Sequence, residues 1–104
     1  MQDLPKAAAS YAARETIRND VWYSTAVKVT RYFEAVRSRP DRAIIQDAWI
    51  ERAIRGPVRE STQEDGRIRR WVMIPEMENR YLRVVLLEDG ETVHNAFFDR
   101  GFVP

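Results

Sequence analysis

Cysteine is absent from the sequence and histidine occurs only once, as His94, so several kinds of site are excluded at the outset. Without cysteine there is no disulfide scaffold, no thiol nucleophile and no cysteine-based zinc site. One histidine is too few for the common structural zinc sites. The chain also lacks a glycine-rich phosphate loop and the HExxH and GxSxG motifs. We therefore expect no bound metal and no cofactor.

Long apolar runs are missing as well. No segment approaches the length needed to cross a membrane, and the N-terminus has no signal-peptide apolar core. These absences predict a cytoplasmic protein without membrane association. At 104 residues, of which 44% are hydrophobic, the chain has room for one domain with a modest core.

Lysine is also scarce. Of the 17 basic residues only Lys6 and Lys28 are lysine, and the others are arginine. The formal net charge is +1, which gives no general argument for nucleic-acid binding. Arginine suits bidentate contacts with phosphate and stacking on aromatic rings. A GC-rich genome produces the same bias, and we give that explanation more weight than function.

The N-terminal third of the chain divides into an extension and an ambiguous segment. Residues 1–20 are alanine-rich and have few large apolar residues, so we expect an extension that is helical or disordered, ahead of a single domain over 21–104. Alternation and β-branched residues favour a strand near 22–30. Tyr32, Phe33 and Val36 fit a helix face as well as a strand. Pro40 is expected to close the segment.

The clearest helix is expected over about 45–56. Trp49, Ile50, Ala53 and Ile54 form one apolar stripe at helical spacing. The following Gly-Pro pair ends the helix. This stripe is the expected cover for one face of a β-sheet.

Four strands follow, over about 58–64, 67–74, 80–87 and 92–98. The first two and the last two are joined by Asp65-Gly66 and Asp89-Gly90, and Asp-Gly between apolar runs is a strong signal for a hairpin. The fold class is therefore α+β, with the helix packed on a four-stranded antiparallel meander.

The turns also predict a register. If each Asp-Gly pair is a two-residue turn with positive φ at both residues, Val85 faces His94 and Glu60 faces Trp71. The middle loop is longer. If Ile74 pairs with Arg80, then Trp71 lies opposite Arg83.

The two-residue period of a strand then separates two faces. The expected core face collects Ile68, Val72, Ile74, Leu82, Val84, Leu86, Val93 and Phe97, with Arg70 and Asn95 as polar exceptions. The other face collects Glu60, Thr62, Arg67, Arg69, Trp71, Met73, Tyr81, Arg83, Val85, His94 and Phe98. This second face is basic and aromatic, and we expect it to be exposed.

A limited chemistry is open to such a face. Imidazole serves as a general acid or base near neutral pH, guanidinium groups hold a phosphate, and aromatic rings stack unpaired bases. These are the parts of a metal-independent ribonuclease that uses the 2′-hydroxyl of its substrate. The candidate catalytic residues are His94, Arg83 and Arg69, and the candidate substrate-binding residues are Tyr81, Trp71 and Arg67. A lone strand histidine is more often structural, so this alternative stays open.

The runs DGRIRRW and YLRVVLLEDGETVHNAFFDR resemble a domain-of-unknown-function family of short bacterial, cyanobacterial-type proteins, over roughly residues 31–102. In layout the chain is also similar to toxins of the BrnT and RelE type. That likeness implies a small ribonuclease with its active face on the sheet, an RNA substrate and an antitoxin-like protein partner. The active residues of those toxins are matched here only by residue type, and the likeness implies Arg69, Arg83, His94 and Tyr81 as their counterparts.

One alternative belongs to another class. The same face suits a noncatalytic interaction module that binds a partner protein or a second copy of the chain as a homodimer, because exposed aromatic residues are typical of interface cores.

Overall fold

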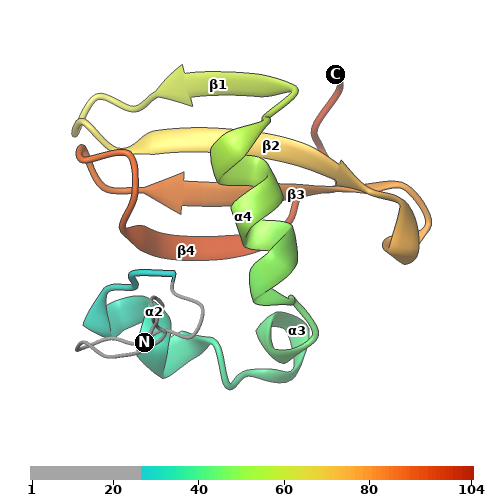
Figure 1. Cartoon of the computed structure of the whole chain (residues 1–104), viewed down its shortest axis with the longest axis horizontal. Helices are drawn as coiled ribbons and strands as arrows, with labels where there is room; N and C mark the ends of the chain where they lie inside the picture. The colour runs from blue at the N-terminus through green and yellow to red at the C-terminus, as the bar shows by residue number, and fades with distance from the viewer. Residues whose placement is uncertain (1–26) are drawn as a thin grey trace, which may run out of the picture.

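The computed structural model describes residues 27–104, which form a four-stranded antiparallel sheet with three α-helices. The helices are α2 (Arg31–Val36), α3 (Pro40–Ala43) and α4 (Asp47–Arg55), and the strands are β1 (Arg59–Thr62), β2 (Ile68–Ile74), β3 (Arg80–Leu86) and β4 (Val93–Phe98). The strand order is β1-β2-β3-β4, so the predicted α+β meander is confirmed (Figure 1). The extension predicted over 1–20 and most of the strand predicted near 22–30 lie outside the described residues.

Helix α4 covers one face of the sheet, as its apolar stripe predicts. It crosses the strands in Figure 1 and contacts β2 and β3. Trp49, Ile50 and Ala53 are buried, and Ile54 packs at the edge of the same core. The core opposite the helix contains Val72, Ile74, Leu82, Val84, Leu86, Val93 and Ala96. Burial of these side chains is the main stabilising contribution to the fold.

The ambiguous segment before α4 is helical. Helix α2 begins after Thr30, whose hydroxyl accepts the Phe33 N–H at 3.1 Å as an N-cap. Phe33 and Val36 are buried, and α2 lies beside β4. Pro40 does not close this segment: it begins α3, where a proline at the first helical position costs no hydrogen bond.

Both Asp-Gly turns differ from the predicted two-residue form, because only the glycines, Gly66 (φ 92°) and Gly90 (φ 73°), have positive φ. The first loop spans three residues, closed by the Gln63 N–H bonded to the Arg67 carbonyl at 2.7 Å. The second spans four residues. Its aspartate, Asp89, accepts hydrogen bonds from the backbone N–H groups of the two residues that follow Gly90. The aspartates therefore act as local acceptors rather than as left-handed turn residues.

The middle turn has the register that was predicted. Ile74 pairs with Arg80, and Trp71 lies opposite Arg83. The paired positive φ values expected at the Asp-Gly turns occur here instead, at Glu78 (58°) and Asn79 (62°). Two successive residues with positive φ are the signature of a type I′ turn.

Both outer strands are shifted by one residue against the prediction, β1 by its three-residue loop and β4 by an extra residue after Val93. Arg59, rather than Glu60, faces Trp71, and on β4 Phe97 faces Arg83. Phe97 therefore shares the face of Arg83, while Phe98 packs against the core. The predicted assignments of these two phenylalanines were the wrong way round, because a shift of one residue moves every side chain to the opposite face.

His94 is the extra residue of a β-bulge. Val93 pairs with Leu86 and Asn95 pairs with Val85, so one residue of β4 has no partner on β3. The predicted pairing of His94 with Val85 is therefore wrong. Across the described residues, no helix is long and apolar enough to span a membrane.

Candidate functional site

The face of the sheet turned away from α4, here called the outer face, is organised in rows that run across the strands. One row is formed by Arg59, Trp71, Arg83 and Phe97. The next row is formed by Ser61, Arg69, Val85 and Asn95. Four of the six predicted site residues lie on this face: Arg69, Trp71, Tyr81 and Arg83.

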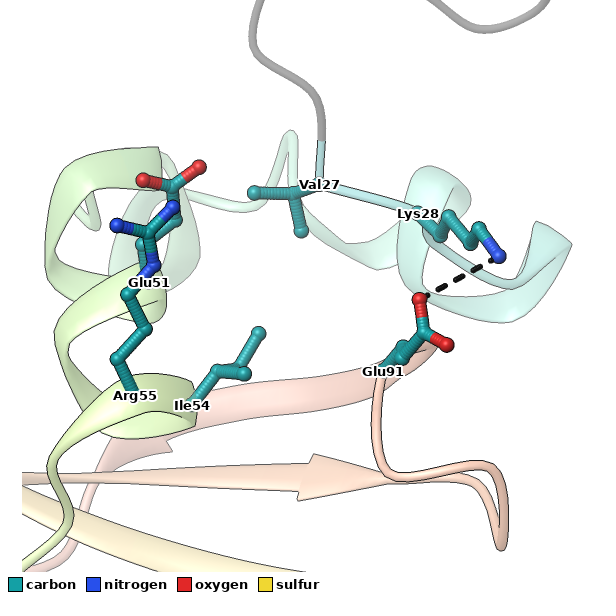
Figure 2. A pocket seen from close by; sticks show the side chains of 6 residues that line it. All are labelled: Val27, Lys28, Glu51, Ile54, Arg55 and Glu91. Carbon is teal, nitrogen blue, oxygen red and sulfur yellow. Dashed lines mark ion pairs between the residues drawn. The ribbon is translucent and has the colours of Figure 1, made fainter.

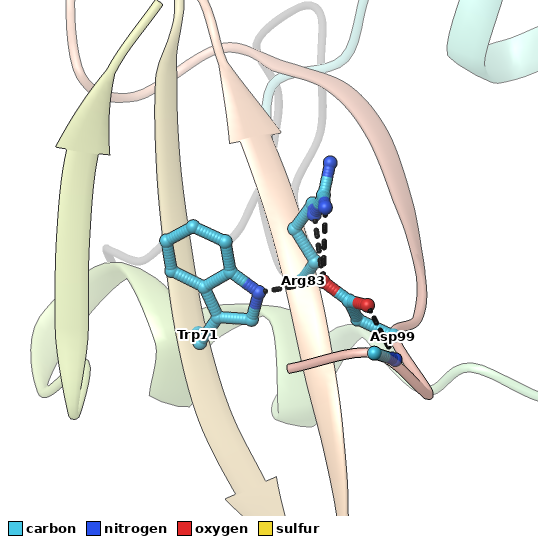
Figure 3. A network of polar contacts seen from close by, with 4 residues as sticks. Trp71, Arg83 and Asp99 are labelled. Atoms are coloured by element: carbon cyan, nitrogen blue, oxygen red, sulfur yellow. Dashed lines mark hydrogen bonds and ion pairs between the residues drawn. The ribbon is translucent and has the colours of Figure 1, made fainter. Parts of the chain in front are cut away.

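Arg83 is held in place on three sides, of which Figure 3 shows Asp99 and Trp71. Its guanidinium donates to Asp99 Oδ2 through Nη2 at 2.9 Å and through Nε at 3.1 Å. Its guanidinium carbon also lies 5.5 Å from the ring centroid of Trp71 and 5.0 Å from that of Phe97. A guanidinium engaged in this way is a structural group, and its charge is already balanced.

Asp99 joins Arg83 to Trp71. The indole N–H of Trp71 donates to the same Asp99 Oδ2 at 3.0 Å, and the Gly101 N–H donates to Oδ1 at 3.1 Å. The Trp71 indole and the Arg83 guanidinium hold the pKa of Asp99 below its ordinary value, although burial acts in the opposite direction. The carboxylate stays ionised and connects the strands to the C-terminal turn.

The C-terminal turn covers the aromatic residues of the outer face. The ring of Phe102 stacks on Trp71, with centroids 4.8 Å apart and planes at 15°, and lies against Tyr81 at 5.0 Å. Only 6% of Trp71 is exposed. The expectation that Trp71 is exposed was therefore wrong, because residues after β4 fold back over it.

Arg69 lies on the outer face, with its guanidinium carbon 5.9 Å from the Trp71 centroid. Its Nε atom and the hydroxyl of the neighbouring Ser61 are both buried and have no hydrogen-bond partner within residues 27–104. Arg67 lies nearer the loops and forms an ion pair with Asp65 at 3.6 Å. That carboxylate is about half exposed, so the pair contributes little to stability.

His94 lies in a separate environment, formed with the segment before α2. Its Nδ1 atom is 3.2 Å from the hydroxyl of Thr30, and its ring stacks on Tyr32 with centroids 4.9 Å apart. Burial lowers the pKa of His94, the charge of Arg67 lowers it further, and Asp65 raises it by a smaller amount. The imidazole is therefore held neutral at physiological pH.

The predicted residues thus form two groups rather than one. Arg69, Trp71, Tyr81 and Arg83 share the outer face, whereas His94 and Arg67 lie toward the hairpin loops. The position facing Arg83 on β4 is three residues from His94, a separation of roughly 10 Å at the rise of a strand. Within the described part of the chain, no hydrogen bond or cation–π contact joins the imidazole to Arg83 or Arg69.

Four residues in these groups were not among the predicted site residues: Thr30, Tyr32, Asp99 and Phe102. No site role was predicted for Asp99. The DRGF run that contains it, immediately after an aromatic strand end, was the available signal. An aspartate two residues before a glycine is typical of a tight turn, which returns the next aromatic residue to the sheet. Thr30 and Tyr32 carry no comparable signal in the sequence.

A hollow of about 240 Å³ lies on the other side of the molecule, between α4 and the start of the described chain (Figure 2). Lys28 and Glu91 form an ion pair there at 3.5 Å, and Arg55 and Glu51 line the opposite wall. Two cations and two carboxylates balance one another. The hollow therefore has no net charge with which to select a ligand.

Within residues 27–104, no group of three potential ligand side chains could hold a metal ion. Comparison with known proteins finds no matching family model, no similar curated protein and no matching solved structure.

Proposed function

We propose that this protein is a small, toxin-like, metal-independent ribonuclease in which His94 is the general base. The observation that carries the proposal is the state of the imidazole. Its Nδ1 atom is engaged with the Thr30 hydroxyl, its ring is held against Tyr32, and burial and the charge of Arg67 lower its pKa, which favours the neutral form. A general base must be unprotonated at the working pH and fixed in direction, and His94 meets both conditions.

The hydrogen bond to Thr30 orients the base. A hydroxyl oxygen has two lone pairs, so it can accept the Phe33 N–H and also the Nδ1–H of His94. In that tautomer Nε2 is the unprotonated nitrogen. It would take the proton of a substrate 2′-hydroxyl while the new bond from the 2′-oxygen to phosphorus forms. The bond from phosphorus to the 5′-oxygen breaks, and the leaving oxygen takes up a proton from the imidazolium.

Arg67 is the proposed phosphate ligand. It is the arginine whose charge acts on the imidazole, and its partner Asp65 is exposed to solvent and can be exchanged for a phosphate. Arg69, two residues further along the chain in β2, would add a second positive charge. Arg83 is bound to Asp99, so we assign it a positioning role instead of the catalytic role expected from its residue type.

The test is RNA cleavage by the purified full-length chain, followed on a labelled single-stranded oligoribonucleotide in the presence of a chelator. His94→Ala should lower the rate on the order of 10²–10⁴-fold, the contribution typical of a general base. Arg67→Ala should lower it by a smaller factor. The matched control is Arg39→Ala, because Arg39 is an exposed arginine between α2 and α3 and should leave the rate unchanged. An inactive wild type, or equal activity in His94→Ala, would contradict the proposal.

A cytoplasmic location and an antitoxin-like protein partner belong to the same proposal. Expression of the wild type in a bacterial host without the partner should arrest growth, and His94→Ala should not. Arrest by both proteins would point to an effect of expression that is unrelated to cleavage.

A second candidate function is a noncatalytic interaction module. The observation that favours it is the outer edge of β1, which has no strand partner among residues 27–104. An open edge can pair with a strand of another protein or of a second copy. Stable self-association in sedimentation experiments, together with intact RNA, would select this candidate.

A further inference from the structure

Phe102 lies in a slot with three walls. Trp71 stacks on its ring, Tyr81 meets it at an interplanar angle of 56°, and the guanidinium carbon of Arg59 lies 5.2 Å from its centroid. A flat aromatic floor with an arginine against the same ring is how proteins commonly hold an unpaired base. The occupant in this case is a side chain of the same molecule.

We propose that this slot is a binding site for a nucleobase of single-stranded RNA and that Phe102 fills it in the free protein. The inference rests on the proposed ribonuclease function and extends it, because it assigns substrate recognition to a place apart from His94. A base that entered the slot would replace the stacking of Phe102 on Trp71 with its own.

The walls of the slot do not depend on Phe102. Trp71 is fixed by its hydrogen bond to Asp99, and Asp99 is fixed by Arg83. The backbone N–H of Asp99 also donates to the Tyr81 carbonyl at 2.9 Å. Departure of the residues that follow Asp99 would remove the Gly101 N–H bond to Oδ1 but keep the three bonds that Trp71 and Arg83 donate to Oδ2, so the slot is preformed for a new occupant.

The segment that carries Phe102 is held by few polar contacts. The Phe102 N–H lies 3.4 Å from the Asp99 carbonyl, which is a long hydrogen bond. The Gly101 N–H donates to Asp99 Oδ1 at 3.1 Å, and Arg59 donates to the Val103 carbonyl at 3.2 Å. Gly101 is exposed, and Val103 is 75% exposed. Displacement of this segment therefore breaks little besides the ring contacts, which a base restores.

A hollow of about 360 Å³ adjoins the slot, between the β2–β3 turn and the C-terminal turn. Arg80 and Arg100 line it, together with Phe102 and Tyr81. Its two carboxylates are Glu78 and Asp99, and because Asp99 is already paired with Arg83, the arginines retain an excess positive charge. Guanidinium groups next to aromatic rings suit the phosphates on either side of a stacked base. Phe97, the β4 residue in the row of Trp71, lies roughly 10 Å along β4 from His94. At ~3.4 Å for each nucleotide, about three nucleotides cover this distance, so one RNA strand could reach both places.

The experiment measures binding of a fluorescein-labelled 2′-O-methyl octaadenylate to the full chain by fluorescence anisotropy. The methylated 2′-oxygen cannot act as a nucleophile, so cleavage does not enter the measurement. Phe102→Ala should bind on the order of tenfold more tightly than the wild type, as expected for one newly available base-stacking position. Phe102→Leu, which keeps apolar volume for folding but loses the flat ring, should also bind more tightly.

Two controls make the result specific. Val103→Ala alters an exposed neighbour and should bind as the wild type does. Adding Arg59→Ala to Phe102→Ala should remove most of the gain, because one wall of the slot is lost. Wild-type affinity in both Phe102 variants would overturn the proposal. Equal competition by inorganic polyphosphate would also overturn it, because charge rather than stacking would then account for binding.

The two proposals fail separately. A gain in oligonucleotide binding by the Phe102 variants, with no cleavage of RNA by any form, would retain the slot and reject the ribonuclease. Cleavage that depends on His94, with no change in binding on substitution of Phe102, would retain the ribonuclease and reject the slot.

Discussion

The network of Trp71, Arg83 and Asp99 and the surroundings of His94 use similar chemical groups but leave them in different states. In the network, two strands and the C-terminal turn converge on one carboxylate oxygen, which receives three hydrogen bonds. His94 is engaged at one ring nitrogen, by Thr30, within residues 27–104. The first region is closed and charge-balanced. The second leaves the other ring nitrogen of His94, Nε2, available for a reaction.

This difference shows that residue type alone does not distinguish a structural arginine from a catalytic one. Arg83 on β3 and Arg67, just before β2, carry the same group, yet Arg83 faces a carboxylate that is 13% exposed while the partner of Arg67 is 50% exposed. The deciding factor is the shielding of the counter-ion from water, since a buried pair resists exchange and an exposed one does not.

The largest expected effect comes from breaking the closed region. Asp99→Ala should lower the free energy of unfolding by about 2–4 kcal/mol, because it leaves the charge of Arg83 and the Trp71 indole without their acceptor in a largely buried setting. Asp99→Asn should cost less, because one acceptor oxygen remains. Urea unfolding followed by circular dichroism measures both values.

The comparison holds only if an exposed carboxylate behaves differently. Asp41 is the matched control, because it is also paired with an arginine but its side chain is 67% exposed. Asp41→Ala should change stability by no more than about 0.5 kcal/mol. Equal losses in Asp99→Ala and Asp41→Ala would show that burial does not separate the two kinds of pair.

A smaller effect is expected at Thr30, which joins the open region to the fold. Thr30→Val should cost about 1 kcal/mol, because α2 loses its N-cap and His94 loses its hydroxyl partner, whereas Thr30→Ser should preserve both contacts. A double-mutant cycle with His94→Ala, measured by urea unfolding, isolates the coupling between the two side chains. A coupling of zero would mean that Thr30 acts only as a helix cap.

Much of the fold could be predicted because it depends on local pattern. The apolar stripe of α4, the alternation along β2 and β3, and the register between those two strands follow from residue periodicity. Strand β1 could not be aligned correctly, because Asp-Gly is compatible with loops of two, three or four residues. Strand β4 could not be aligned correctly either, because its bulge at His94, rather than its loop, shifts the residues that follow by one.

The site was less predictable for a related reason. The sequence indicates that arginine, tryptophan and tyrosine share one face, and four of them do. It does not indicate that the bulge separates His94 from the Arg83 row, nor that Phe102 returns to stack on Trp71. Both depend on contacts between segments far apart in the chain, for which no short motif exists.

The smallest expected effect is a dependence of stability on pH that separates the two regions. His94 has a folded pKa below its ordinary value of 6.5, so the unfolded chain binds more protons as the pH falls past 6.5. Stability should be full above that pH, decline as the pH drops from 6.5 to the folded pKa, and then level off. The pKa of Asp99 is also lowered, from an ordinary value of 3.8, so its contribution to stability should be lost only as the pH falls below 3.8.

His94 is the only histidine of the chain, so no other side chain with an ordinary pKa titrates between pH 5 and 8. Urea midpoints measured from pH 7.5 to 5.0 should therefore decline in the wild type and stay level in His94→Asn. Because the imidazole is partly exposed, solvent screens part of the effect, and the decline should be smaller than the loss in Asp99→Ala. If the urea midpoint of His94→Asn declined by the same amount, the decline would come from the carboxylates. The lowered pKa of His94 would then be contradicted.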